Sequence, residues 1–453
     1  MPFVPTALDS NRSTSVDHRM RLGFGALAAF LALSVYAGSS VIPPRARAGI
    51  GIVALLCFTA ACSRDLKHVS WRTVGWGLAL QVGLAVATLK LEIGGVRPVY
   101  EFFAAGARVV ERFLAFSEAG ARFVFGGLSD PEVMSQVFPG GFVFAFSALP
   151  AIVFVSAVFT ILFHIGVVQL VVRAMAAVMI KVMRTSGAET LAVSADVFMG
   201  MTEVPLVIKP YIPQMTRSEL LTLMTGGLAT VSGGMMVVYI GVGADPVAAL
   251  ATSVMAAPAS LYLSKLLQPE LGEPVTRAHA RISPERPHAN IIDAAASGAS
   301  DGMILAINVA AMLIAFLALI AMTDAMLGLV VPGLTLAGIL SHLFAPVALL
   351  LGVPLADVGP MADLLGTKLV ANEMVSFVKL TTEYRGVVSD RTHTLATFAL
   401  NGFANLGSIG VILGGIGGLF PARRRELAQL SGYALLAGFV ATLLNAAIAG
   451  LLL

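Results

Sequence analysis

The sequence predicts an all-α polytopic membrane protein with about nine spanning helices. Only 12% of its 453 residues are charged and the mean hydropathy is +0.87, whereas soluble domains carry roughly 25% charged residues. Several apolar runs reach about 20 residues, the length that crosses a bilayer. A membrane β-barrel would show short segments of alternating polarity, which the sequence lacks. We also expect inverted repeats with two re-entrant helical hairpins and two discontinuous helices, for the reasons that follow.

The expected spans are apolar runs, each bounded by polar or helix-breaking residues. The first is too long for a removable signal peptide and lacks the small-residue cleavage pattern, and Pro43-Pro44 ends it. The stretch 325–352 is apolar but broken by prolines, so whether it crosses the membrane stays open, and His342 within it is expected to pack or to lie at the interface. The expected spans are 23–42, 49–62, 73–92, 141–172, 219–241, 247–267, 302–323, 395–420 and 427–452.

The segment 98–127 differs from the spans because charged and aromatic residues are interleaved along it. Their spacing predicts a helix with one apolar stripe and one charged face. Such a helix lies along the membrane surface or packs on the bundle as an ordinary extramembrane helix. A shorter basic amphipathic piece, with Arg173, Lys181 and Arg184, is expected after the fourth span.

Two further regions, 187–212 and 355–385, are too polar and too broken for clean spans but too apolar for solvated loops. Irregular backbone at membrane depth is tolerated only inside protein or beside a water-filled cavity, so each is expected to be a re-entrant hairpin. Within them, the short stretches 200–205 and 370–375 each place one glutamate beside a small polar residue, Glu203 after Thr202 and Glu373 after Asn372. A charge at that depth costs several kcal/mol unless it is partnered, which makes both glutamates candidate functional residues.

The two halves of the chain repeat this pattern. Each hairpin glutamate is followed by a glycine-rich break early in the next span, at Gly227–Thr230 and at Gly402–Asn405. Alternation of the spans makes the hairpins enter from opposite sides, and discontinuous helices that meet near the midplane are typical of secondary transporters. Close helix packing explains most of the other glycines. We therefore expect one polar site, formed by Thr202, Glu203, Glu373, Asn405 and Ser408.

The chemistry of this site favours binding over catalysis. Carboxylates accept strong hydrogen bonds from hydroxyls in a dry pocket, so a sugar or nucleoside is a plausible ligand. Freed backbone carbonyls bind cations, and Asp196, Thr230 and the carbonyls near Met199 and Val231 have suitable spacing. No His-Glu-x-x-His or paired-aspartate motif is present, so no enzyme activity is expected. Neither the net charge of +3 nor the two cysteines supports a nucleic-acid partner, a disulfide framework or a metal cluster.

The orientation follows from the distribution of lysine and arginine in the short connections. The N-terminus and most of the basic connections, the last of them Arg423–Arg425, fall on one side when the spans alternate. The positive-inside rule makes that side the cytoplasm and puts the C-terminus outside. Arg45, Arg47 and the charges of 97–122 oppose this assignment.

At these residues the sequence resembles the concentrative nucleoside transporter family, and the resemblance covers roughly residues 50 to 453. Residues 1 to about 48, with the first span, lie outside the bacterial core pattern. The resemblance is carried by Gly200-Met201-Thr202-Glu203-Val204-Pro205-Leu206, Pro213-Gln214-Met215-Thr216-Arg217-Ser218-Glu219-Leu220, Gly226-Gly227-Leu228-Ala229-Thr230, Asn372-Glu373, Gly402-Phe403-Ala404-Asn405 and the glycine-rich tail Gly414–Gly418 with Arg423-Arg424.

The resemblance implies a homotrimer of nucleoside importers in the cell inner membrane, coupled to Na⁺ or H⁺ and without any other cofactor. By position, Glu203, Glu373, Asn405 and Ser408 would hold the ribose, and Met201 and Thr202 would face the base. Met235, Leu305 and Phe403 would line the pocket, and the coupling cation would lie at Asp196, Met199, Thr230 and Val231. The implied division is 1–48 (tail and extra helix), 49–172 (scaffold and interfacial helix), 173–267 (first transport repeat), 268–300 (polar loop), 301–352 (scaffold or trimerisation helix and interfacial segment) and 353–453 (second transport repeat).

Three positions depart from the family pattern. Met201 replaces the usual glutamine that faces the base, and Met235 replaces a smaller aliphatic residue, so base preference does not carry over. Asp196 replaces the usual sodium-site asparagine, and a desolvated carboxylate that takes a proton favours proton coupling slightly over sodium coupling. Two alternatives stay open: a cation symporter of another hydroxylated metabolite, and a binding or sensor protein without turnover.

Overall fold

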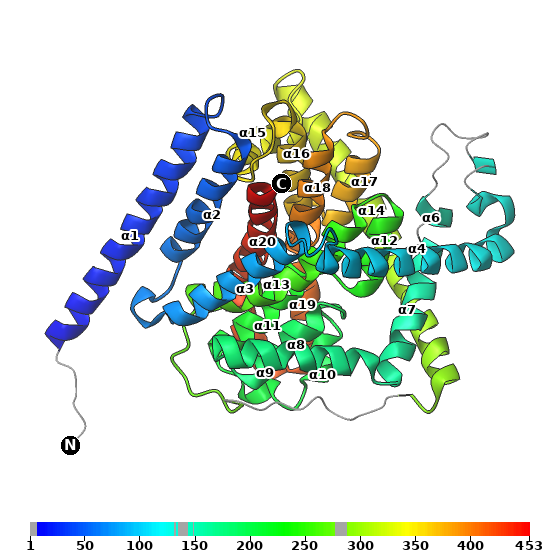
Figure 1. The fold of residues 1–453 in the computed structure, drawn as a ribbon, viewed down its shortest axis with the longest axis horizontal. Coiled ribbons are helices and arrows are strands. Elements are labelled where there is room, and N and C mark those ends of the chain that lie inside the picture. Colours follow the sequence, from blue (N-terminus) through cyan, green and yellow to red (C-terminus); the bar gives the residue numbers. More distant parts are fainter. Residues whose placement is uncertain (1–6, 131–132, 135–143, 148, 277–287) are drawn as a thin grey trace.

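The computed structural model describes residues 7–130, 133–134, 144–147, 149–276 and 288–453, and these are almost entirely helical, with no β-strand among them. Figure 1 shows the helices wound around a central group that contains α13 and α20. The helices are α1 (Ala7–Ala37), α2 (Pro44–Ala61), α3 (Trp71–Leu89), α4 (Pro98–Phe125), α6 (Phe144–Ser147), α7 (Leu149–His164), α8 (Val167–Met183), α9 (Gly187–Asp196), α10 (Val204–Val207), α11 (Arg217–Ala229), α12 (Gly233–Gly241), α13 (Pro246–Leu267), α14 (Ile291–Val330), α15 (Leu336–Leu350), α16 (Val358–Val370), α17 (Glu373–Thr381), α18 (Asp390–Leu400), α19 (Leu406–Leu419) and α20 (Arg424–Leu452).

Six helical segments of the described residues are long and apolar enough to cross a membrane, and the bent pair α7–α8 adds a seventh candidate. The six are α1, α2, α3, the interrupted pair α11–α12, α13 and α20 with the short turn before it. The nine predicted spans correspond to these seven candidates together with α14 and the interrupted pair α18–α19. The exact number of crossings stays a prediction.

The fourth span was expected as one continuous run over 141–172, and this is wrong within the described residues. The chain turns by 71° between α7 and α8, at Ile165–Gly166. Gly166 has φ +91°, a left-handed conformation that a residue without a Cβ adopts freely, and it ends the helix there. The apolar run therefore continues into α8, the basic amphipathic helix that contains Arg173 and Lys181.

Both interrupted helices restart at a polar residue that caps the second half. Ser232 precedes α12 and accepts a hydrogen bond from the Met235 amide, and Asn405 precedes α19 and accepts one from the Ser408 amide. A side-chain oxygen at this position satisfies a free N–H group of the first helical turn. The discontinuities predicted in each half thus have matched local causes.

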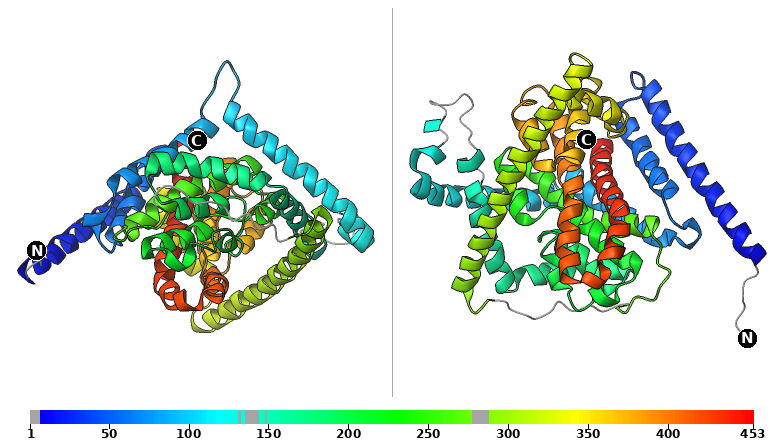
Figure 2. Two further views of the ribbon diagram at one scale, coloured as in Figure 1. Left: turned by 90° about the horizontal axis from the view of Figure 1, so that it is seen from below. Right: turned by 180° about the vertical axis from the view of Figure 1, so that it is seen from behind.

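The two hairpins lie at opposite ends of the molecule. Figure 1 and the right view of Figure 2 show α9 and α10 at the lower end and α16 and α17 at the upper end. The two termini of the described chain also lie at opposite ends, with α1 beginning low and α20 finishing high. The polar loop expected over 268–300 ends earlier, because α14 begins at Ile291 with Asn290 as its cap.

A buried charge network fixes the base of the first hairpin. Ser186 with Glu189 and Thr216 with Glu219 form capping boxes at the starts of α9 and α11. The two boxes are joined, because the Ser186 hydroxyl donates to Glu219 Oε1 at 2.5 Å. Lys265 of α13 binds Glu189 at 2.7 Å and Glu270 at 2.9 Å, which compensates the buried charges. This network therefore holds together the starts of hairpin arm α9 and of α11, the first half of the broken helix.

Candidate functional site

Glu373 is the centre of a buried polar cluster. It begins α17 directly after Asn372, and the residue is only 4% exposed. Glu373 Oε1 accepts a hydrogen bond of 2.8 Å from the Tyr239 hydroxyl, and Oε2 accepts one of 2.9 Å from Asn405 Nδ2. The cluster thus joins the second hairpin to α12 of the first repeat and to the start of α19. Bonds of this kind to an ionised acceptor are the strong ones in a dry site.

Asn405 has two roles, one for each end of its side-chain amide. Its Oδ1 accepts from the Ser408 amide at 2.8 Å, which caps α19, and its Nδ2 reaches Glu373. Ser408 is 6% exposed in the first turn of that helix. The structure therefore brings together three of the predicted residues, Glu373, Asn405 and Ser408.

Tyr239 belongs to this cluster and was not predicted from the sequence. Its ring stacks on Phe377 of α17, with centroids 4.6 Å apart and an interplanar angle of 25°. The signal for it in the sequence is weak: it is the one phenol in the otherwise apolar run of α12. A buried tyrosine hydroxyl requires a partner, and here that partner is the Glu373 carboxylate.

Glu203 and Thr202 occupy the tip of the first hairpin and are exposed. Glu203 Oε2 accepts from the Gly200 amide at 3.1 Å, and no hydrogen bond joins Glu203 to Glu373 among the described residues. Thr202 faces α19, since a Cβ placed on Gly415 would lie 3.7 Å from Thr202 Cγ2. The tip is held to α12 by a backbone bond of 3.0 Å from the Gly233 amide to the Phe198 carbonyl.

Asp196, at the end of α9, has the most unusual environment of the predicted cation residues. It is fully buried, and neither carboxylate oxygen has a hydrogen-bond partner among the described residues. The carboxylate lies against Gly226 in the last turn of α11, where a Cβ would collide with it. A buried carboxylate without a donor requires a proton or a cation. The chemistry of this group therefore fits a coupling ion.

The other predicted cation residues surround the break that follows α11. Thr230 Oγ1 donates to the Gly226 carbonyl at 2.8 Å, and both Thr230 and Val231 are buried. Met199 follows Asp196 closely in the hairpin turn and is partly exposed. No group of three or more His, Cys, Asp or Glu side chains in the described part of the chain is arranged to hold a metal ion. A cation here would thus depend on Asp196, hydroxyl and backbone oxygens.

The two helix breaks meet through main-chain atoms. The Phe403 amide donates to the Thr230 carbonyl at 3.1 Å. Gly402 leaves no room for a side chain, because a Cβ there would lie 2.9 Å from the Ala229 carbonyl oxygen and 2.6 Å from Thr442 Cγ2. The unwound segments of the two repeats are therefore joined directly.

The remaining predicted pocket residues are apolar. Met235 is 4% exposed in the first turn of α12, and Met201 packs on α11, since a Cβ on Gly227 would lie 2.7 Å from Met201 Cβ. Phe403 is half-buried at the second break. Leu305 belongs to α14, but its side chain lies outside the described residues.

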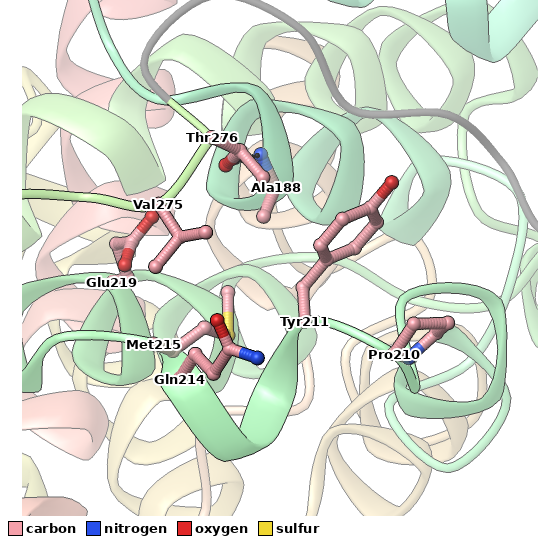
Figure 3. A pocket seen from close by; sticks show the side chains of 8 residues that line it. All are labelled: Ala188, Pro210, Tyr211, Gln214, Met215, Glu219, Val275 and Thr276. Atoms are coloured by element: carbon pink, nitrogen blue, oxygen red, sulfur yellow. Dashed lines mark hydrogen bonds between the residues drawn. The ribbon is translucent and has the colours of Figure 1, made fainter.

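A cavity of about 180 Å³ opens at the base of the first hairpin, and Figure 3 shows the side chains around it. None of the predicted substrate or cation residues whose side chains the structure describes lines it. The lining residues are Ala188, Pro210, Tyr211, Gln214, Met215, Glu219, Val275 and Thr276. This cavity is therefore not the site that contains Glu373.

Comparison with known proteins places the chain in a family. Three family models match in succession: Na⁺ dependent nucleoside transporter N-terminus at 50–128, Nucleoside recognition (gate) at 145–246, and Na⁺ dependent nucleoside transporter C-terminus at 248–450. These matches and the helical fold define a multi-pass membrane transporter rather than an enzyme. The chain belongs to the concentrative nucleoside transporter family.

Relatives and solved structures agree with this assignment. The chain is 39% identical over 412 residues to an "Uncharacterized transporter" of Haemophilus influenzae, covering 89% of this chain and 96% of the relative. It is 37% identical over 449 residues to "Sodium/nucleoside cotransporter 1" of Homo sapiens, covering 94% of this chain and 67% of the relative. The structure of CNTnw in an inward-facing substrate-bound state is 38% identical, with a TM-score of 0.84 over 90% of this chain and 98% of that one.

Proposed function

We propose that the protein is a cation-coupled nucleoside symporter that imports nucleosides by alternating access. The observation that carries the proposal is the buried Glu373 carboxylate, held by Tyr239 and Asn405 where the second hairpin meets both broken helices. Membership of the family, and relatives named as sodium/nucleoside cotransporters, support a nucleoside as the substrate class. A carboxylate placed in this way accepts hydrogen bonds from a diol such as that of ribose.

In this proposal the substrate lies between the two hairpin tips. Glu203, Glu373, Asn405 and Ser408 bind the ribose hydroxyls, and Met201 and Thr202 face the base. Met235, Leu305 and Phe403 line the apolar part of the pocket. The exposure of Glu203 supports this arrangement, because its carboxylate is free to accept from a ligand on the side away from Gly200.

The coupling cation is proposed to lie at Asp196, Thr230 and the backbone carbonyls of Met199 and Val231. The two unpartnered oxygens of Asp196 support this position. Either Na⁺ or H⁺ compensates the charge of these oxygens: Na⁺ is coordinated by the carboxylate, whereas H⁺ neutralises it. The relatives whose names describe sodium/nucleoside cotransport favour Na⁺ as the coupling ion, whereas the carboxylate at position 196 favours H⁺.

We further propose a homotrimer in the inner membrane, with the N-terminus in the cytoplasm. Contacts of the basic residues assigned to the cytoplasm support their lying on the same side of the membrane. Arg64 pairs with Gln268 at 3.3 Å, and Arg423 binds the carbonyls of Ile212 and Met215 at the base of the first hairpin. The division into scaffold and transport repeats given above is part of the same proposal.

Uptake into proteoliposomes tests the function. Labelled uridine and adenosine are offered separately under a sodium gradient and under a proton gradient, with empty liposomes as the control. Accumulation that requires one of the gradients supports the proposal. Cation-driven uptake of another hydroxylated metabolite, with both nucleosides excluded, would favour the alternative substrate class, which Met201 makes worth testing. Nucleoside binding without any gradient-driven uptake would contradict the symporter.

A further inference from the structure

Lys368 is a fully buried cation to which the proposed function assigns no role. It lies in the last turn of α16, the first arm of the second hairpin, and the residue is 0% exposed. Its ammonium group donates to the Ala399 carbonyl at 2.7 Å and to Thr442 Oγ1 at 2.9 Å. The Phe439 ring lies 5.3 Å from the nitrogen, a further contact that favours a positive charge. A charge buried this deeply is costly unless its surroundings compensate it.

The acceptor of Lys368 is the end of a broken helix. Ala399 is in the last turn of α18, which stops at Leu400 before the break that leads to Asn405. The last carbonyls of a helix have no partner in the helix and carry partial negative charge, so a cation is stabilised there. Glu373 begins the second arm α17 of the same hairpin, and no ion pair joins it to Lys368 among the described residues.

The first repeat has the same arrangement with the charge reversed. Asp196, at the end of hairpin arm α9, lies against Gly226 in the last turn of α11, the half-helix that stops before the other break. In each repeat, therefore, the last turn of a hairpin arm meets the last turn of the following half-helix. The first repeat presents a carboxylate without a partner, and the second presents an ammonium whose acceptors are in place.

We propose that Lys368 is a resident cation of the second repeat. Its ammonium group occupies, at the end of α18, the position that a mobile cation takes beside Asp196 at the end of α11. The second repeat therefore needs no mobile ion of its own. Lys368 holds the tip of the second hairpin, where Glu373 lies, against the second broken helix throughout the proposed transport cycle. The inference rests on the proposed cation site at Asp196.

The test replaces the tethered charge and asks whether a free ion takes its place. Uridine binding to the purified full chain is measured against Na⁺ concentration for the unaltered chain, Lys368→Ala and Lys368→Arg. In Lys368→Ala the Ala399 carbonyl and the Thr442 hydroxyl are left for a free cation. We therefore expect the slope of log Kd for uridine against the logarithm of Na⁺ concentration to become steeper by about one, which corresponds to one more bound ion. Methylammonium, which fits the vacated space, is expected to restore the original dependence, and Lys368→Arg to retain it.

An unchanged Na⁺ dependence in a folded, uridine-binding Lys368→Ala would overturn the inference, since a merely structural lysine gives that result. Should Lys368→Ala fail to fold, anomalous diffraction from the unaltered chain soaked in Tl⁺ decides the question. No Tl⁺ is expected within coordination distance of the Ala399 carbonyl, and a peak there would overturn the inference. Failure of the unaltered chain to bind uridine would instead contradict the proposed function, so the two failures are distinct.

Discussion

The Tyr239 hydroxyl donates a 2.8 Å hydrogen bond to Glu373 Oε1 across a separation of 134 positions in the chain. Tyr239 is part of the first repeat and Glu373 of the second, so this bond joins one repeat to the proposed binding carboxylate of the other. Because Asn405 occupies the second oxygen, the carboxylate is oriented from two sides before any ligand arrives. The following predictions depend on this arrangement and on the groups around it.

Removal of the Tyr239 hydroxyl should weaken substrate binding. In Tyr239→Phe the ring still stacks on Phe377, but Glu373 loses one of its two fixed donors. A hydrogen bond to a charged group contributes about 1.5–3 kcal/mol, so we expect uridine Kd to rise by about ten-fold or more in calorimetry. Tyr262→Phe is the matched control, because that buried hydroxyl binds Gln81 and not the cluster. Equal losses in both variants would contradict the role given to Tyr239.

An amide at position 201 should change base preference. Met201→Gln restores a hydrogen-bonding group at the position proposed to face the base, and one such bond contributes about 0.5–1.5 kcal/mol. We expect the ratio of uridine to adenosine affinity to shift by roughly three- to ten-fold in competition uptake. Met201→Leu keeps the volume without the amide and should leave the ratio unchanged. An unchanged ratio in Met201→Gln would remove this residue from the base site.

Asp196→Asn should separate the two coupling ions. The amide cannot take up a proton in the physiological range, whereas its oxygen still ligates Na⁺. We therefore expect proton-driven uridine uptake to be lost and sodium-driven uptake to persist. Uptake by the same proteoliposome preparation under each gradient provides the measurement. Proton-driven uptake that survives the substitution unaltered would exclude Asp196 as the proton carrier.

A methyl group at Gly226 should disturb the same site from the helix side. In Gly226→Ala the added Cβ meets the Asp196 carboxylate, which has no free space on that side. We expect the cation concentration for half-maximal uptake to rise by roughly ten-fold, because the carboxylate must move away from the break. Gly410→Ala adds a methyl group where nothing lies within 4 Å and serves as the control. If both variants behave alike, Asp196 does not bind the cation at this position.

Asp357, outside the spanning segments, should make stability depend on pH. Burial alone raises the pKa of its carboxyl group, but hydrogen bonds from Ser389 and Thr392 outweigh burial and hold the pKa below its ordinary value. A lowered pKa contributes stability above the unfolded pKa of about 3.9, and this stability is lost as the pH falls through the folded value. We expect Asp357→Asn to lower the Tm by a few degrees at pH 7 in detergent, and the difference to shrink toward pH 3. A Tm difference that stays constant over this range would contradict the assignment.

Local pattern was enough to predict much of this molecule. The lone glutamates in apolar sequence, and the glycine-rich breaks with Thr230 and Asn405, predicted the interrupted helices and the Glu373–Asn405–Ser408 group. The family comparisons confirm the transporter class. Tyr239 and Lys368 were missed because each resembles an ordinary residue of its own helix and acquires its partner only through long-range packing. The turn at Gly166 was missed because the apolar run continues through it, and hydropathy does not report backbone direction.

The bond between the Phe403 amide and the Thr230 carbonyl has a consequence for how the family diversifies. Every residue other than proline supplies these two groups, so the joint between the repeats places little demand on side-chain identity. Substitutions at the positions proposed to face the ligand, such as methionine at 201, can therefore accumulate without separating the two halves. A transporter built in this way can change its substrate over evolution while its two repeats stay joined.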